Sequence, residues 1–433
     1  MLNFSMIGLV RRNGKKMDKK IRQEMIHFYR PFRNIPCFLQ SPIERVRKKT
    51  KKLPVVIKFE PGSFVSGLND VKKTKCKSLH EYPSISCCSA KLSVENIEHL
   101  VKNCSHIKKV YYDRKMTTLL DTASPAINSG LLKDNGLTGE GVTIAVIDTG
   151  IHPHEDLKGR IIGFADFING RNNPYDDNGH GTHCAGDAAG NGSLSDGKYQ
   201  GPAPDANLVG VKVLDKMGTG SLSTVIEGID WCIQNQAEYN INILSLSLGS
   251  DAMESAEDDP VVNAVETAWD NGMVVCVAAG NSGPAEQTIA SPGISPKVIT
   301  VGAADDTNTV ERSDDSVADF SSRGPTIDGL TKPDLLTPGV EIISLRAPNS
   351  FLDKTNKKAR VDGNYMSLSG TSMATPICAG VVAQLLQSAS DFTPDQVKEQ
   401  LMNACEDLGQ SPNVQGAGYL NAAILIRDEA TKV

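Results

Sequence analysis

Three polar residues stand in glycine-rich settings and follow one another in the order aspartate, histidine, serine. Asp148 lies in VIDTG at 146–150, His180 in NGHGTH at 178–183 and Ser372 in GTSMATP at 370–376. A serine hydroxyl needs a neighbouring base to become a nucleophile, and histidine can serve near neutral pH. A carboxylate then fixes the tautomer of that base. The three residue types predict acyl transfer by a serine nucleophile.

Each of these residues also has a simpler interpretation when it is taken alone. Asp148 could cap a turn, the GTS segment could cap a helix, and His180 with His183 could suggest a metal site. The two histidines lack a partner glutamate or a third ligand at a usual metal-binding spacing. The shared chain order and the three glycine-punctuated contexts favour one catalytic site.

The surrounding pattern indicates an α/β domain that positions these residues. Near-continuous apolar runs predict strands covered on both faces, hence a parallel sheet, at 142–147, 208–213, 241–248, 273–278 and 298–301. Helices are expected at 223–235, 260–271, 371–388 and 394–404. Asp148 then ends a strand, whereas His180 and Ser372 begin helices. The N–H groups and the dipole of the helix at Ser372 would stabilise an oxyanion.

The N-terminal region has a different composition. A strand at 53–59, a strand at 82–91, a helix at 94–102 capped by Ser93, and a strand at 107–112 predict a small α+β module. Residues 1–52 are basic and weakly periodic, and residues 48–52 are interpreted as a linker. The expected division is therefore a basic extension at 1–52, a small domain at 53–120 and a large domain at 121–433.

The charge is divided unevenly along the chain. Residues 1–120 hold 26 Lys and Arg against 9 Asp and Glu, whereas residues 121–433 hold 19 against 42. The two parts could complement each other electrostatically, which we favour. The alternatives are a nucleic-acid-binding arm, testable by a salt-sensitive gel shift, and a solvated basic tail. No run of 18 apolar residues occurs, so no membrane span is expected.

The three signature segments resemble those of the subtilases, the subtilisin-like serine proteases. The resemblance runs from about residue 139 to residue 418 and includes AAGNSG at 278–283, GPAPDA at 201–206 and FSSRGP at 320–325. It implies a subtilisin-like three-layer αβα fold with a mostly parallel sheet. It also implies a serine endopeptidase that works through an acyl-enzyme and needs no cofactor for its chemistry. A silent binding protein of this fold and a hydrolase of non-peptide esters are the rival hypotheses.

The resemblance also implies roles for residues beside the triad. Asn281 would donate its side-chain amide to the oxyanion, together with the backbone N–H of Ser372. Two segments would sandwich an extended peptide as an added strand: Gly218, Thr219 and Gly220, and Ser247, Leu248 and Gly249. Apolar side-chain pockets would be lined by Leu222, Leu248, Gly249 and Gly280. Broad specificity with an apolar or aromatic residue before the scissile bond (P1) is expected.

By the same resemblance, residues 53–120 are a propeptide, an intramolecular inhibitor and folding chaperone. Its tail, 111–120, would occupy the active cleft, and self-cleavage would fall within 114–124. Cys184 resembles the cysteine beneath the catalytic histidine of thiol-bearing subtilases, so partial inactivation by mercurials is expected; an inert packed thiol is the alternative.

The sequence gives only indirect evidence on calcium binding. Asp156 matches a calcium ligand of the family, but the loop at 190–197 differs from the loop that usually supplies the remaining ligands. Asp176 and Asp177 form a second acidic pair or a polar loop.

The N-terminal apolar stretch lacks a preceding charge and a cleavage site, so no signal peptide is expected. Several of the ten cysteines lie in apolar runs, which favours a cytoplasmic protein; export by a non-standard route is the alternative.

Overall fold

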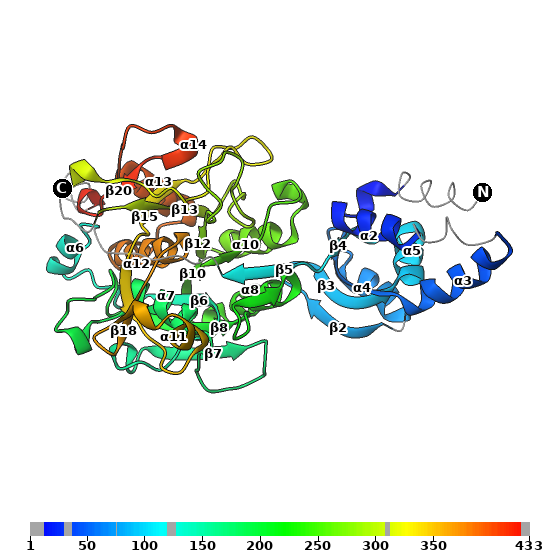
Figure 1. Ribbon diagram of the computed structural model, residues 1–433, viewed down its shortest axis with the longest axis horizontal. Coiled ribbons are helices and arrows are strands. Elements are labelled where there is room, and N and C mark those ends of the chain that lie inside the picture. The colour runs from blue at the N-terminus through cyan, green and yellow to red at the C-terminus, as the bar shows by residue number, and fades with distance from the viewer. Residues whose placement is uncertain (1–12, 30–36, 75, 119–126, 308–311, 426–433) are drawn as a thin grey trace. The chain divides into compact units, whose positions relative to one another are not determined.

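A computed structural model describes residues 13–29, 37–74, 76–118, 127–307 and 312–425 of the chain (Figure 1). The chain forms two compact units, Met1–Arg114 and Lys115–Val433. The border lies before the one expected at residue 120, because the segment from Lys115 pairs within the second unit. Among the described helices, none combines the length and the apolar character that a membrane span requires.

The first unit contains a four-stranded antiparallel sheet in the order β2-β3-β1-β4. Its elements follow the chain as a βαββαβ module: β1 (Lys52–Phe59), α4 (Phe64–Lys73), β2 (Lys77–Tyr82), β3 (Cys87–Ser93), α5 (Val94–Asn103) and β4 (Ile107–Tyr112). The expected cap of α5 is confirmed, since Ser93 Oγ accepts from Asn96 N at 3.2 Å. The single strand expected at 82–91 is wrong, because a turn closed by Ser86 N to Pro83 O at 3.0 Å divides it.

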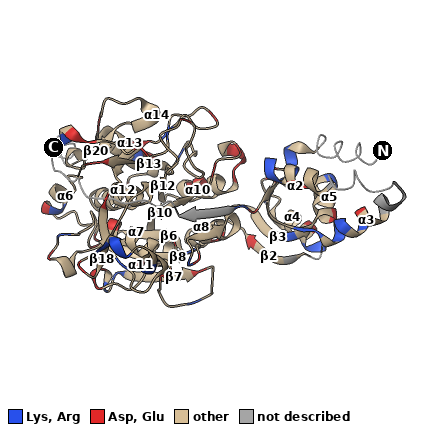
Figure 2. Ribbon diagram, viewed as in Figure 1, with Lys and Arg blue, Asp and Glu red and all other residues tan. Residues whose placement is uncertain are grey.

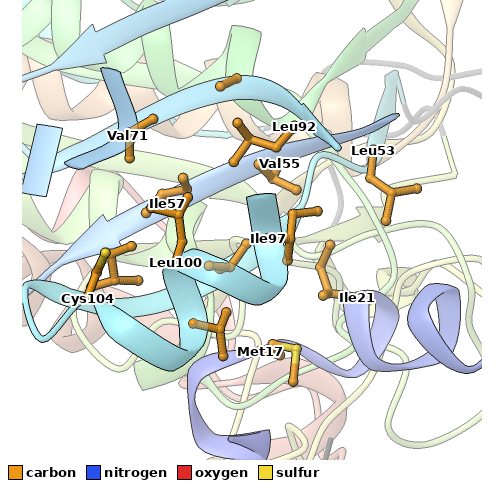
Figure 3. Packing of buried hydrophobic residues seen from close by; sticks show 14 of the residues in the cluster. Met17, Ile21, Leu53, Val55, Ile57, Val71, Leu92, Ile97, Leu100 and Cys104 are labelled. Atoms are coloured by element: carbon orange, nitrogen blue, oxygen red, sulfur yellow. The ribbon is translucent and has the colours of Figure 1, made fainter. Parts of the chain in front are cut away.

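Residues before β1 also belong to the first unit. They form η1 (Gly14–Lys16), α2 (Lys19–Tyr29) and α3 (Cys37–Thr50). Met17 and Ile21 are buried in the same cluster as Leu53 and Ile97, as Figure 3 shows. The linker expected at 48–52 is therefore wrong, because α3 ends at Thr50 and β1 begins at Lys52. Figure 2 shows Lys and Arg on α2 and α3, so many of the basic residues of this region lie in helices.

The second unit contains a large sheet in the order β19-β20-β15-β13-β12-β10-β6-β8-β7, with β14 paired to β13. The neighbours from β20 to β7 are parallel, whereas β14 and β19 are antiparallel. The strands are β6 (Thr143–Asp148), β7 (Ile161–Asp166), β8 (Asn207–Lys212), β10 (Ile241–Leu246), β12 (Val274–Ala278), β13 (Ile299–Asp305), β14 (Ser316–Val317), β15 (Leu335–Pro338), β19 (Cys405–Glu406) and β20 (Tyr419–Leu420).

Helices cover both faces of this sheet. The α-helices are α6 (Gly130–Asp134), α7 (His180–Ala189), α8 (Leu222–Gln234), α9 (Gln236–Tyr239), α10 (Pro260–Asp270), α11 (Phe351–Thr355), α12 (Thr371–Ser388), α13 (Pro394–Asn403) and α14 (Pro412–Gln415). Successive strand residues point to opposite faces. Ile147 of β6 faces α8, since its Cγ2 would lie 3.8 Å from a Cβ added at Gly228. The next residue, Asp148, faces α7, because it forms a hydrogen bond with His180. The two helices therefore cover opposite faces of β6. Because α10 packs on α8 and α12 on α7, the predicted three-layer α/β fold is confirmed.

The described residues of the second unit also contain two small antiparallel sheets and five short 3₁₀ helices. One sheet has the order β11-β5-β9, with β5 (Lys115–Thr118), β9 (Thr219–Ser221) and β11 (Leu248–Gly249). The other is β16 (Ile342–Leu345), β18 (Tyr365–Leu368) and β17 (Arg360–Val361). The 3₁₀ helices are η3 (Glu155–Leu157), η4 (Ser193–Ser195), η5 (Ala256–Asp258), η6 (Arg312–Asp314) and η7 (Lys357–Ala359). The run expected as one strand at 241–248 is thus divided between two sheets.

Candidate active site

Asp148 lies at the carboxyl end of β6, which lies between β10 and β8 in the large sheet. Its side chain is fully buried, and its Oδ1 accepts from Thr149 N at 2.7 Å. Its Oδ2 has no hydrogen-bond partner among the described residues. A buried carboxylate is costly unless it is paired, so this position demands a partner with a positive or donating group.

His180 supplies that partner from the first turn of α7. Its Nδ1 lies 2.7 Å from Asp148 Oδ1, and both side chains are buried. Burial lowers the pKa of the imidazole, but the charge and the hydrogen bond of Asp148 outweigh this effect and raise the pKa above its ordinary value. Within the described part of the chain, the buried Nε2 has no hydrogen-bond partner. The ring is therefore fixed at one nitrogen and available for proton transfer at the other.

Asp176 holds the segment that leads into α7. Its Oδ1 accepts from Gly179 N at 2.8 Å and Thr149 Oγ1 at 3.0 Å, and its Oδ2 accepts from Thr182 N at 2.9 Å. It thereby ties the histidine loop to the residue after Asp148. The sequence pattern predicts only an acidic pair or a polar loop for this buried residue, because the hydrogen bonds that define its role join separate segments.

Ser372 lies in the first turn of α12, after Gly370 with a φ of 146°. Its Oγ donates to Ser247 O at 3.1 Å, and its own carbonyl oxygen accepts from Ser247 Oγ at 2.7 Å. Cys184, one turn along α7 from His180, joins the two helices: its Sγ lies 3.5 Å from Ser372 O and 3.7 Å from His180 Nδ1. The three residues predicted from the sequence are therefore brought together by β6, α7 and α12.

Asn281 follows β12 and reaches the start of α12. Its Oδ1 accepts from Thr371 N at 3.0 Å and Thr371 Oγ1 at 2.9 Å. The buried Nδ2 has no partner in the described parts of the chain. Because the oxygen is held by the residue before Ser372, the amide group has a fixed orientation and keeps a donor available beside the serine.

The two predicted substrate walls lie on either side of β5. Thr117 of β5 is paired with Thr219 in β9 and with Gly249 in β11. A segment of the chain thus runs as the middle strand between the two walls. Leu222 and Leu248, predicted to line side-chain pockets, are both fully buried.

Comparison with known proteins places these observations in a family. The sequence pattern of the Subtilase family matches residues 139–419. The chain belongs to the subtilases. It is 52% identical to the serine protease AprX of Bacillus subtilis (strain 168), over 98% of both chains. M-protease of Shouchella clausii (strain KSM-K16) is 34% identical over 86% of this chain and 87% of the relative. Subtilisin Savinase of Lederbergia lenta is 37% identical over 68% and 94%.

Membership of the subtilases makes the chain a serine endopeptidase, of the AprX type. Subtilases need no cofactor for catalysis, which agrees with a site built from a carboxylate, an imidazole and a hydroxyl. In the described residues, the one group of three potential metal ligands is Asp148, His180 and Cys184. Burial raises the pKa of the Cys184 thiol well above its ordinary value, because the buried site disfavours the charge of a thiolate.

The surroundings of Asp156 do not fit the calcium ion of the subtilase family. Its Oδ1 accepts from Ser193 Oγ at 3.0 Å and Leu194 N at 3.1 Å, and its Oδ2 accepts from Tyr365 OH at 2.8 Å. Both carboxylate oxygens of Asp156 are therefore held by hydrogen-bond donors of the protein. Calcium prefers a shell of six to eight oxygens, so these bonds stabilise the carboxylate in a different way.

Proposed function

We propose that this subtilase hydrolyses peptide bonds with Ser372 as nucleophile, His180 as general base and acid, and Asp148 as the residue that orients His180. The observation that carries the proposal is the 2.7 Å bond from His180 Nδ1 to Asp148, beside a serine held in the first turn of α12. His180 Nε2 takes the proton of the serine hydroxyl and returns it to the leaving amine. Water then hydrolyses the acyl-enzyme through the same groups.

Asn281 is proposed to stabilise the tetrahedral oxyanion, together with the backbone N–H of Ser372. Its buried Nδ2, without a partner among the described residues, supports this role. The two bonds from Thr371 to Oδ1 prevent the amide from turning over. A donor that is fixed before the reaction costs no reorganisation when the negative charge develops.

The substrate is proposed to bind as an extended strand between β9 and β11. The pairing of β5 with Thr219 and Gly249 supports this, because it uses the backbone groups that a peptide substrate would use. Leu222, Leu248 and Gly280 would then face the substrate side chains, which favours an apolar or aromatic P1 residue. Kinetics on a panel of peptides that differ only at P1 will test this; a strong preference for an acidic residue would contradict it.

The N-terminal unit is proposed to act as an intramolecular inhibitor and folding chaperone that is removed by self-cleavage. The position of β5 between the two walls supports inhibition, because a strand there excludes substrate. The cleavage window expected at 114–124 extends past β5 into residues outside the described part. N-terminal sequencing of active enzyme that finds an intact Met1 would contradict processing.

One experiment separates this function from its rivals. Purified protein and the Ser372→Ala variant are incubated with a chromogenic peptide that carries Phe or Leu at P1, while the mass of the chain is followed. Hydrolysis by the wild type alone supports the serine mechanism. Hydrolysis of simple esters without hydrolysis of peptides would favour a non-peptide acyl hydrolase. Lack of any hydrolysis after removal of the N-terminal unit would favour a silent binding protein.

A cytoplasmic location is also proposed. The nine cysteines among the described residues are free thiols, and seven of them are buried, which suits a reducing compartment. Cell fractionation with an antibody against the second unit is the test. Recovery of the protein from the culture medium of intact cells would favour the alternative, a non-standard route of export.

A further inference from the structure

A buried lysine lies beside the catalytic aspartate. Lys212 is the last residue of β8, and its backbone is paired with that of Asp148, the last residue of β6. The side chain of Lys212 is fully buried. A charged group in such a place is costly unless protein groups replace its water shell, so the hydrogen-bond partners of this ammonium group decide what it does there.

Three acceptors surround the ammonium group of Lys212. Its Nζ donates to Thr149 O at 2.5 Å, to Asp177 Oδ1 at 2.7 Å and to Leu214 O at 3.0 Å. An ammonium group has three N–H donors and no acceptor, so these three bonds satisfy it completely. The ring of Tyr175 adds a contact with the cation, since its centroid lies 5.1 Å from Nζ.

Two of the acceptors belong to the segments that carry the catalytic pair. Thr149 directly follows Asp148 in the chain, and Asp177 lies three residues before His180. One ammonium group therefore ties the turn after the aspartate to the loop that enters α7. The distance of 2.7 Å between His180 Nδ1 and Asp148 Oδ1 depends on how these two segments lie.

The third acceptor belongs to the segment that leads to the predicted substrate wall at β9. Leu214 N donates to Asp148 O at 3.2 Å, while Leu214 O accepts from Lys212. The next residue, Asp215, is held to the wall, because Asp215 N donates to Thr219 O at 2.9 Å. The position of Thr219 relative to Asp148 thus depends in part on the same lysine.

We propose that Lys212 is a positioning residue for the peptidase reaction: its ammonium group holds the aspartate turn, the histidine loop and the β9 wall in one arrangement. The inference rests on the proposed roles of Asp148, His180 and β9. Lys212 acts through these segments and not by contact with the reacting atoms, since its three N–H groups are already bonded within the protein. A displacement of about 1 Å in a reacting group can lower the rate about 10²-fold, so loss of these bonds should appear in the kinetics.

The first test removes the ammonium group and keeps an apolar stem. In Lys212→Met the three acceptors lose their donor, so kcat should fall at least about 10-fold. KM should rise, because the β9 wall loses one of its links to the aspartate turn. Lys332→Met is the matched control, since Lys332 is also a fully buried lysine and its Nζ lies 2.6 Å from Asp334, outside the three segments. The control should keep the kcat and KM of the wild type.

The measurement must separate positioning from stability. Hydrolysis of a chromogenic peptide is measured with the purified full-length chain once its activity is constant. The concentration of active sites comes from stoichiometric labelling of Ser372 with a fluorophosphonate, and thermal unfolding is followed in parallel. Kinetic constants per labelled site exclude molecules that fail to fold. A purely structural role of Lys212 would therefore lower the melting temperature and leave kcat and KM per labelled site unmoved.

Asp177→Ala gives a second test that does not empty a fully buried position. The Asp177 side chain is 35% exposed, so water can take the place of its carboxylate at Lys212 Nζ. Lys212 then keeps its bonds to the turn and to the wall, whereas the histidine loop is released. We expect kcat to fall about 3-fold or more with little change in KM. Asp270→Ala, which breaks an ion pair of 2.6 Å with Lys297, is the matched control and should change neither constant.

The possible results separate this inference from the proposed function. Wild-type constants per labelled site in Lys212→Met, or a wild-type kcat in Asp177→Ala, overturn the positioning role and leave the serine mechanism intact. Equal losses in the two matched controls overturn it as well, because they assign the effect to general destabilisation. If Lys212→Met does not fold, Asp177→Ala alone decides. Lack of peptide hydrolysis by the wild type, even after removal of the N-terminal unit, overturns the proposed function and this inference with it.

Discussion

In both Asn281 and His180, one end of the side chain is held by hydrogen bonds, whereas the other end has no hydrogen-bond partner among the described residues. Thr371 holds Asn281 through Oδ1, and Asp148 holds His180 through Nδ1. The opposite atoms, Nδ2 and Nε2, are buried without partners among the described residues. An unsatisfied buried polar atom is costly, so we interpret both as donors or acceptors for a bound substrate.

The first prediction at this scale concerns pH. Burial lowers the pKa of His180, but Asp148 more than offsets this, so the pKa lies above its ordinary value. His180 must be neutral to accept the serine proton; a raised pKa therefore moves the acid limb of kcat/KM to a pH above about 6.5. In Asp148→Asn the limb should move to lower pH, and the rate should fall about 10⁴-fold.

The pH–rate profile of kcat/KM measures both effects. Asp319→Asn is the matched control, because the Asp319 side chain is 98% exposed, and its profile should equal that of the wild type. An acid limb that is unmoved in Asp148→Asn would show that the carboxylate does not set the pKa of the base.

The second prediction concerns the oxyanion. Asn281→Leu removes the donor at Nδ2 and should lower kcat by about 10²–10³ with little change in KM; this magnitude is known for a subtilisin, a member of the same family. Steady-state kinetics will measure it. Asn271→Leu, an exposed position at the end of α10, is the control. An equal loss in both variants would indicate damage to the fold rather than loss of the donor.

The third prediction concerns the thiol between the two catalytic helices. A mercurial bound to Cys184 Sγ, which lies 3.7 Å from His180 Nδ1, should displace the imidazole and inactivate the enzyme in part. Cys184→Ser should resist the reagent, whereas Cys232→Ser, with its buried position on α8, should stay sensitive. Residual activity after titration is the measurement, and full sensitivity of Cys184→Ser would contradict the mechanism.

At the scale of elements, the site depends on how closely α7 approaches β6. Gly181 is the residue of contact, because a Cβ at this position would overlap the carbonyl oxygen of Gly150 and lie 3.1 Å from Asp148 Cβ. A helix with any side chain here would have to move away from the strand. The distance between Asp148 and His180 is thus set by the absence of one methyl group.

The fourth prediction follows from this contact. Gly181→Ala should lengthen the bond from His180 to Asp148, lower kcat/KM at least about 10-fold and destabilise the fold by about 1–3 kcal/mol. Enzyme kinetics and thermal unfolding are the measurements. Gly130→Ala in α6 is the control, because a Cβ there meets nothing within 4 Å. Unchanged kinetics in Gly181→Ala would show that α7 can shift without cost.

At the scale of the whole molecule, the chain joins a basic unit to an acidic one. The first unit has its own core, centred on residues such as Ile57 and Ile97, and therefore has the means to fold as a module. Under the proposed function, opposite net charges would favour association of the cleaved N-terminal unit with the protease unit. Such attraction weakens as salt shortens the Debye length to below about 10 Å.

The fifth prediction applies to release of the inhibitor. The lag before full peptidase activity should shorten as the salt concentration rises from about 0.05 to 0.5 M, because screening weakens the attraction between the fragments. Progress curves of freshly purified full-length protein will show it. Enzyme that has already lost the N-terminal unit is the control and should show no lag. A lag that is independent of salt would contradict an electrostatic contribution.

The sequence by itself determined those features that depend on residues close together in the chain. The chain order of Asp148, His180 and Ser372, the strand that ends at Asp148 and the cap of α5 at Ser93 were all readable, because each depends on neighbours within a few residues. The cap of α13 is similar, since Thr393 and Gln396 bond to each other within one turn. Hydrophobic periodicity likewise gave the main strands and therefore the fold class.

Only the tertiary structure decided how these pieces act on one another. Thr371 meets Asn281 across 90 residues, Asp176 joins two loops, and hydrogen-bond donors from Ser193 and Tyr365 surround Asp156. Contacts between distant segments depend on the packing of the whole chain, which local propensity does not encode.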